Sequence, residues 1–231
     1  ILNNGIHGIS FSPYVEGQGP GTQIGADQIR ERLAFIQPYV SWIRTFSCSE
    51  GNELIPAIAR ENGLKTLIGG WLDDNKEQNE IELANAIEIA NAGHADILGV
   101  GNEVLLRGDV PVQQLITYLD RARAGIDIPV STAEPPYIWK RYPELVKHVD
   151  YIAVHLLPYW ENIPVDAAVD YVVSRYQELQ RTYPGKPIVI AEVGWPSNGR
   201  TRGGAVASRA NQACFVEFGL CTTAWDRKTG S

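Results

Sequence analysis

Short apolar runs alternate along the chain with longer segments in which apolar residues recur at helical spacing. The clearest helical pattern spans residues 25–40, where Ile29, Leu33, Ile36 and Val40 are three or four positions apart. The strand-like runs cover residues 5–14, 42–48, 65–72, 97–108, 129–136 and 151–160, and the stretch that begins at Pro187. Seven such βα units joined by short connections predict a parallel sheet with helices outside it.

Two architectures fit this alternation, and the residues at the strand ends distinguish them. A doubly wound sheet places ligands at a switch point, whereas a (β/α)₈ barrel gathers functional residues from the C-terminal ends of many strands. Polar or aromatic residues stand at the end of nearly every expected strand: Tyr14, Arg44, Trp71, Asn102, Glu103, Glu134, Tyr159, Trp160, Glu192 and Trp195. This distribution favours an α/β fold of the (β/α)₈ TIM-barrel class, at the small end of its size range.

Length and composition restrict the possible partners. With 231 residues, 44% of them hydrophobic, the chain is long enough for one domain, which we expect to span residues 1–231. The net charge of -7 and the pI near 5.1 argue against a nucleic-acid or anionic membrane partner. No apolar run reaches the length of a membrane span, so we expect no membrane contact by this domain.

Metal and nucleotide cofactors are not expected. Three cysteines and four histidines are scattered without metal-ligand spacing. GVGNEV, residues 99–104, contains half of a dinucleotide-binding fingerprint, but Val104 stands where the third glycine belongs. His155 lies within an apolar run, where a hydrogen-bonded core histidine is a better interpretation than a catalyst.

The candidate chemistry depends on two glutamates. Glu103 and Glu192 each follow an apolar run, and an unpaired carboxylate is costly to bury. Trp195 adds a flat apolar face near Glu192, as sugar binding requires. Two carboxyls in one cleft can act as general acid and as nucleophile or base. A separation of about 5 to 5.5 Å would give retention of anomeric configuration, and about 6.5 to 9.5 Å inversion.

Two motifs make a family resemblance specific. IVIAEVGWPSNG, residues 188–199, resembles the signature of glycoside hydrolase family 17, the β-1,3-glucanases, and GVGNEV resembles the Asn-Glu pair of such barrel enzymes. The resemblance implies a retaining mechanism on β-glucan with Glu103 as acid/base, Glu192 as nucleophile and Asn102 holding the sugar 2-hydroxyl. It also implies a secreted or periplasmic protein. SWIRTFSC, STAEPP and VHLLPYWEN look most like bacterial members, some of which transfer glucan chains to other sugars.

Further residues are candidates for substrate binding: Asn102, Arg44, Glu134, Tyr159, Trp160, Trp195, Trp71 and Tyr14. The tryptophans are interpreted as sugar-stacking walls or as packing residues. Tyr159 is interpreted either as a support of the nucleophile through its hydroxyl or as a residue that only caps a strand. Arg44 and Glu134 are either charge partners of the catalytic pair or members of a salt bridge at the barrel rim.

The C-terminal segment departs from the family pattern. After SRANQACFVEFGL the chain has only CTTAWDRKTGS, so an eighth strand from Thr222 to Trp225 would be short and polar. A barrel that lacks one strand exposes two strand edges, which favours dimerisation or loss of stability. An alternative function follows from this departure, namely a degenerate barrel that binds β-glucan without cleaving it. The pair Glu103 and Glu192 argues against it, because a binding module does not need paired carboxyls.

Overall fold

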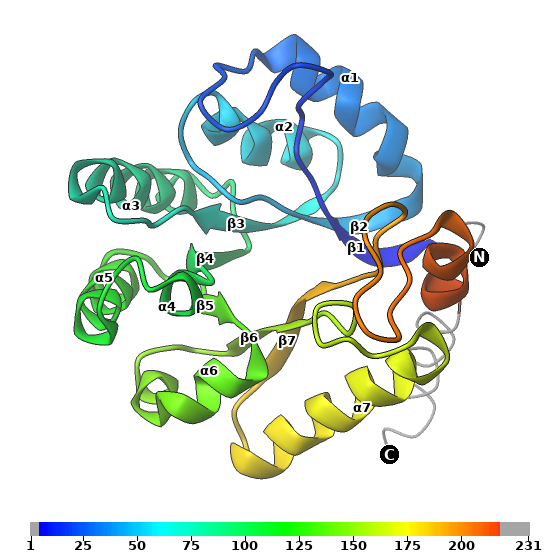
Figure 1. The fold of residues 1–231 in the computed structure, drawn as a ribbon. Helices are drawn as coiled ribbons and strands as arrows, with labels where there is room; N and C mark the ends of the chain where they lie inside the picture. The colour runs from blue at the N-terminus through cyan, green and yellow to red at the C-terminus, as the bar shows by residue number, and fades with distance from the viewer. Residues whose placement is uncertain (1–4, 218–231) are drawn as a thin grey trace. The chain divides into compact units, whose positions relative to one another are not determined.

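The computed structural model describes residues 5–217, and these contain the seven strands that the sequence predicts (Figure 1). The strands are β1 Ile6–Ser10, β2 Val40–Arg44, β3 Lys65–Gly70, β4 Ile97–Asn102, β5 Val130–Glu134, β6 Ile152–Leu156 and β7 Ile188–Val193. The strand order is β1-β2-β3-β4-β5-β6-β7, so consecutive strands are neighbours. The α/β, TIM-barrel-like fold class is confirmed.

Helices connect the strands. They are α1 Ala26–Ile36, α2 Ile55–Glu61, α3 Lys76–Asn91, α4 Val104–Arg107, α5 Val112–Gly125, α6 Pro136–Arg141 and α7 Val165–Thr182, with short 3₁₀ segments η2 Gln37–Tyr39, η3 Asn52–Leu54 and η4 Pro143–Lys147. Residues 209–217 are also helical, up to the end of the described chain. None of the described helices is long and apolar enough to cross a membrane.

The first five strands pair in parallel with their neighbours. Ser10 pairs with Arg44 between β1 and β2, and Gly70 pairs with Val100 between β3 and β4. Between β4 and β5 the register shifts after Gly99, and Asn102 pairs with Ala133. Because these strands run in one direction, their C-terminal ends lie at the same edge of the sheet, where a barrel of this class carries its functional residues.

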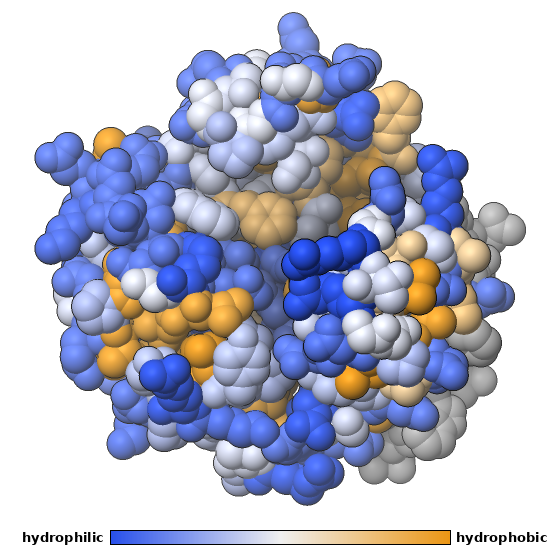
Figure 2. All heavy atoms as spheres, in the orientation of Figure 1, coloured by the Kyte–Doolittle hydropathy of each residue, from blue (hydrophilic) through white to orange (hydrophobic). Residues whose placement is uncertain are grey.

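The chain forms two compact units, one ending at Ala153 and the other beginning at Val154. In the first unit, the predicted apolar face of α1 is buried through Ile29 and Leu33, which pack in one cluster with Ile43 of β2. The surface of α3, in contrast, is mostly hydrophilic (Figure 2). In the second unit, Trp195, Tyr159, Ala168, Ala205 and Phe215 form a separate buried cluster.

Most of the expected elements have different bounds in the structure, and the regions after β4 and β5 are two examples. The strand expected at 97–108 ends at Asn102, because Gly101 and Glu103 have left-handed φ angles of 81° and 53° and α4 starts at Val104. The helical segment after β5 is divided into α6 and η4 at Pro143, since proline lacks the backbone N–H that a continuous helix would use.

The strand at the end of the order is less buried than its sequence predicts. Ile188, Val189 and Ile190 of β7 are only half-buried, although their apolar run is typical of a strand covered on both faces. Within residues 5–217, β7 stands last in the strand order and has β6 as its neighbour. The expected eighth strand, Thr222 to Trp225, lies outside the described residues. The extent of a single catalytic domain over 1–231 stays a prediction.

Candidate functional site

In the first unit, the sequence-predicted residues stand at the C-terminal ends of their strands. Arg44, Asn102 and Glu134 are the last residues of β2, β4 and β5, and Trp71 directly follows β3. Glu103 is the N-cap of α4. These residues therefore lie at the edge of the parallel sheet that the strand-end pattern predicts.

Arg44 and Asn102 form a direct contact between β2 and β4. Nη2 of Arg44 donates to Oδ1 of Asn102 at 2.5 Å, and Arg44 is buried, with 6% of its surface exposed. Its guanidinium also lies over the ring of Phe46 at 4.7 Å from the centroid. Because the oxygen of the Asn102 amide is held by Arg44, the amide nitrogen is directed to a different partner. This orientation suits an amide that donates to a sugar hydroxyl.

Glu103 has an unusual backbone conformation. Its φ of 53° lies in the left-handed region, which is uncommon for residues other than glycine and costs of order 1–3 kcal/mol. The neighbouring contacts support this turn: the N–H of Glu103 donates to the carbonyl of Ala133 at 2.7 Å, and its carbonyl accepts the N–H of Arg107 at 2.8 Å. Such strain is typical of functional positions, and it determines how the Glu103 side chain leaves the strand end.

Glu134 holds the turn that follows Glu103. It is fully buried, and its Oε1 and Oε2 accept the backbone N–H groups of Leu105 at 2.7 Å and Leu106 at 3.4 Å. Burial raises the pKa of Glu134 to about 7; the two backbone hydrogen bonds and Arg107 lower this pKa, and the charge of Glu103 raises it. The geometry therefore gives Glu134 a positioning role beside Glu103, while direct substrate binding by Glu134 stays a prediction.

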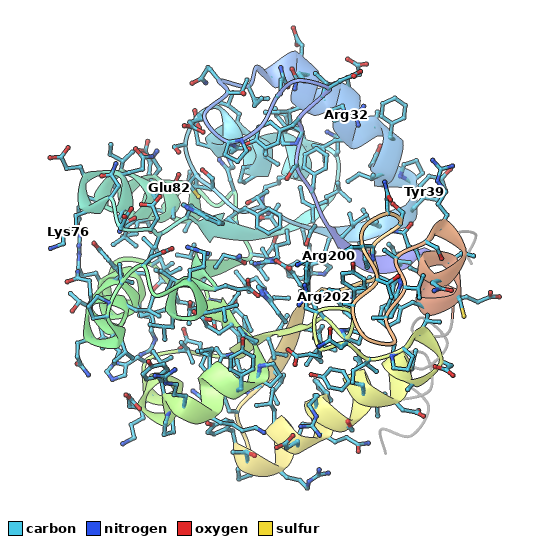
Figure 3. All side chains as sticks on the ribbon, in the orientation of Figure 1. Arg32, Tyr39, Lys76, Glu82, Arg200 and Arg202 are labelled. Carbon is cyan, nitrogen blue, oxygen red and sulfur yellow. The ribbon has the colours of Figure 1, made fainter. Side chains whose placement is uncertain are left out.

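Two residues near this edge carry contacts that the sequence interpretation did not include. Glu82 projects from α3 (Figure 3) and accepts hydrogen bonds from the hydroxyl of Ser47 at 2.6 Å, from the hydroxyl of Ser49, and from the N–H groups of Cys48 at 2.7 Å and Trp71 at 3.1 Å. In the sequence, Glu82 could have been recognised as an acid flanked by the apolar residues of IELANAI. Arg107 has no comparable signal in the sequence.

The aromatic candidates of the first unit have different surroundings. Trp71 is half-buried, and the guanidinium of Arg107 lies 4.5 Å from its ring centroid. Tyr14 is also half-buried and packs against the apolar cluster that contains Ile29. Sugar contact by either ring stays a prediction.

In the second unit, Glu192 and His155 lie together. Glu192 belongs to β7, and its side chain is 24% exposed, whereas the side chain of His155 in β6 is 1% exposed. Nε2 of His155 lies 3.5 Å from Oε1 of Glu192. The buried histidine of the sequence analysis is therefore a neighbour of the proposed nucleophile. The distance between Glu192 and Glu103, which belong to different units, stays a prediction.

An aromatic cluster lies in the same unit as Glu192. The ring of Tyr159 packs edge-on against Trp160 and Trp195, at centroid distances of 5.2 and 5.7 Å. Its hydroxyl donates to the carbonyl of Arg200, so its expected support of Glu192 stays a prediction. Trp160 is 57% exposed, and Arg202 lies 5.0 Å from its ring centroid. Arg200 and Arg202 belong to the loop that follows β7 (Figure 3).

Trp195 is a packing residue in this structure. It is 4% exposed, and its ring lies 5.9 Å from that of Phe215. Its indole N–H donates to the carbonyl of Val206 at 3.0 Å, and its own carbonyl accepts from the side chain of Gln212 at 3.0 Å. These contacts position the loop after β7, while a direct sugar contact by Trp195 stays a prediction.

Within residues 5–217, no group of three or more His, Cys, Asp or Glu side chains is arranged to hold a metal ion.

Comparisons with known proteins point to sugar chemistry. A probable beta-glucosidase, btgE, of Aspergillus flavus is 28% identical over 220 residues, which cover 91% of this chain and 36% of that protein. This chain thus spans little more than a third of that relative. A glucan 1,3-beta-glucosidase of Schizosaccharomyces pombe is 26% identical over 222 residues, covering 87% of this chain and 69% of that protein.

Solved structures agree with the predicted fold. The glycoside hydrolase family 17 β-1,3-glucanosyltransferase of Rhizomucor miehei is 30% identical, with a TM-score of 0.82 over 96% of this chain and 83% of that one. A β-glucuronidase of Bacteroides uniformis, at 15% identity and a TM-score of 0.68 over 92% of this chain and 28% of that one, shares the fold alone.

The three relatives at 26–30% identity come from fungi, so they do not support the expected place among bacterial members. The model of the BtgE/BtgC glycoside hydrolase domain matches residues 8–229, which is nearly the whole chain. The chain therefore belongs to the BtgE/BtgC glycoside hydrolase domain family.

Proposed function

We propose that this chain is the catalytic domain of a retaining glycosidase that acts on β-1,3-linked glucan. The observation that carries the proposal is the position of Glu103 and Glu192 at the ends of β4 and β7, in a member of a glycoside hydrolase family. The chemistry of paired carboxyls explains why acids are needed at both strand ends. The names of the relatives from Schizosaccharomyces pombe and Rhizomucor miehei supply the linkage.

In the proposed reaction, a carboxylate oxygen of Glu192 attacks the anomeric carbon while Glu103 donates a proton to the departing glycosidic oxygen. Glu103 then removes a proton from water or from a sugar hydroxyl, and the oxygen of that group attacks the anomeric carbon and displaces the carboxylate of Glu192. The partial exposure of Glu192 is consistent with sugar access. Asn102, with its amide oxygen held by Arg44, donates to the 2-hydroxyl of the reacting sugar.

Transfer to a second sugar is part of the proposal. One structural relative is an active-site mutant of the Rhizomucor miehei β-1,3-glucanosyltransferase in complex with laminaritriose, at 28% identity and a TM-score of 0.82. A covalent glycosyl-enzyme can react with either acceptor, so hydrolysis and transfer share the same two carboxyls. The length distribution of products over time, measured by mass spectrometry, distinguishes them.

The experiment that tests the proposal compares the parent with Glu192→Gln on laminari-oligosaccharides. We expect shortened or lengthened products with the parent, at least a thousandfold lower turnover with the variant, and retained binding in both. A variant that turns over at the parent's rate would contradict the assignment of Glu192. Measurable affinity with unchanged substrate in the parent would instead indicate the glucan-binding module without catalysis.

The expected dimer is a separate part of the proposal. Within the described residues, β1 and β7 stand at the two ends of the strand order, and Ile9 of β1 and Val193 of β7 are 39% and 50% exposed. We expect strand edges that have no neighbouring strand to pair with a second copy of the chain. Sedimentation equilibrium of the full chain measures this directly, and a monomer at all concentrations would contradict it.

A further inference from the structure

Arg107 is the last residue of α4, and its guanidinium makes contacts on every side. It donates to the carbonyls of Asn102 and, at 2.7 Å, of Leu72, and its Nε lies 2.5 Å from Oδ2 of Asp109. Its central carbon lies 4.5 Å from the ring centroid of Trp71. The side chain of Arg107 is 28% exposed, so these contacts are partly shielded from water.

These contacts join two neighbouring strand ends. Leu72 and Trp71 belong to the loop after β3, whereas Asn102 ends β4, directly before Glu103. A planar guanidinium can donate in two directions and stack on an aromatic face at the same time, which an ammonium group cannot do. Arg107 therefore links the Trp71 loop to the turn that carries Glu103.

Trp71 is held from both its backbone and its ring. Its N–H donates to Glu82 at 3.1 Å, and Arg107 covers one face of its indole. A sugar that stacks on Trp71 would have to use the opposite face. Because the ring orientation is already determined by these contacts, little conformational entropy would be lost when a sugar stacks on it.

We propose that Arg107 is a positioning residue that orients Trp71 as a sugar-stacking platform and thereby determines the affinity for β-glucan. The inference rests on the proposed function, because it assigns to Trp71 a sugar of the same substrate. In this proposal Arg107 acts through the ring of Trp71 and not on the reacting atoms. We therefore expect Arg107 to affect KM, through substrate binding, more than kcat, through the chemical step.

The first test is Arg107→Lys, which keeps the positive charge but cannot span both carbonyls and the ring. We expect KM for laminari-oligosaccharides to rise about tenfold and kcat to change less than about threefold. Isothermal titration calorimetry on the same oligosaccharides measures the loss of affinity independently of turnover. Arg121→Lys is the matched control, because Arg121 also pairs with an acid, Glu80, and lies over a ring, Tyr118, at 5.8 Å. We expect no change in either kinetic constant for the control.

A double-mutant cycle separates positioning from general stabilisation. In a Trp71→Ala background, Arg107→Lys should change KM less than about twofold, because its effect passes through the missing ring. A purely structural arginine would lower the melting temperature and the active fraction to the same extent in both backgrounds. If the full rise in KM persists without Trp71, the inference is overturned.

A milder variant covers the case in which Arg107→Lys does not fold. Asp109→Asn removes the charged partner of the guanidinium while leaving Arg107 in place, and we expect KM to rise about two- to threefold. An unchanged KM in a folded variant of either kind overturns the inference. If the parent neither binds nor converts laminari-oligosaccharides, the proposed function itself has failed and the inference fails with it.

Discussion

Nε2 of His155 lies 3.5 Å from Oε1 of Glu192, and the histidine side chain is almost completely buried. The contact joins β6 to β7, and both residues belong to the second unit. A polar ring beside a carboxylate restricts the orientations that the carboxylate can adopt. His155 is therefore a candidate for positioning the proposed nucleophile.

We predict that His155→Phe lowers kcat/KM about tenfold, which corresponds to about 1.4 kcal/mol of transition-state stabilisation. Phenylalanine keeps an aromatic ring at the position but removes the nitrogen that faces Glu192. Steady-state kinetics on a laminari-oligosaccharide measures the loss. The control is His148→Phe, because Nδ1 of His148 also lies close to a carboxylate, 2.8 Å from Oδ1 of Asp120. Equal losses in both variants would contradict a specific role of His155.

The contact between Arg44 and Asn102 predicts a substrate-dependent loss of activity. Arg44→Met keeps the packing against Phe46 but leaves Oδ1 of Asn102 without the donor at 2.5 Å. We expect about a tenfold lower kcat/KM on an aryl β-glucoside, because the amide can then turn away from the sugar. An aryl 2-deoxy-β-glucoside should lose less than about threefold, since it has no 2-hydroxyl to bind. Equal losses on both substrates would show that Asn102 does not bind this hydroxyl.

Glu134 predicts a pH-dependent contribution to stability. Its pKa is raised from 4.5 to about 7 in the folded protein, chiefly by burial. Between these two values the unfolded chain has released the proton while the folded protein keeps it, so the free energy of unfolding falls as the pH rises. The contribution is fully present below pH 4.5 and is lost above pH 7, and it amounts to about 3 kcal/mol.

Urea unfolding of the parent and of Glu134→Gln at pH 4.5 and pH 8 tests this contribution. Because glutamine does not titrate, the stability of the parent relative to the variant should fall by about 3 kcal/mol over this range. Glu80→Gln serves as a control of opposite sign, since the hydrogen bond from Arg121 lowers the pKa of Glu80. A constant difference between parent and Glu134→Gln would mean that the pKa of Glu134 is not raised in the folded protein.

Glu82 predicts a large loss of stability from a small change. Glu82→Gln replaces one of two acceptor oxygens with a donor, and the oxygens together accept from Ser47, Cys48 and Trp71. We expect the free energy of unfolding to fall by about 2 to 4 kcal/mol, because buried donors lose their partner. Urea unfolding measures this, with Glu88→Gln on the exposed face of α3 as the control. A loss below about 0.5 kcal/mol would contradict the role of Glu82 in holding the loops that follow β2 and β3.

The order of the elements and the two acids were evident from the sequence. Apolar runs indicate which segments become buried strands. Helical spacing indicates which face of a helix is buried, as Ile29 and Leu33 of α1 illustrate. A carboxylate such as Glu103 or Glu192 stands out because it follows an apolar run. Both signals are local, so they need no knowledge of the rest of the fold.

Only the tertiary structure decided how these residues are held. Arg44 and Asn102 are 58 positions apart, and nothing in the sequence between them indicates their hydrogen bond. Three further features depend on which strand ends meet. They are the backbone partners of Glu134, the packing of the Arg107 guanidinium on the ring of Trp71, and the left-handed turn at Glu103. The physical reason is that hydropathy and spacing describe each segment by itself, whereas hydrogen-bond partners and pKa shifts arise from segments that packing brings together.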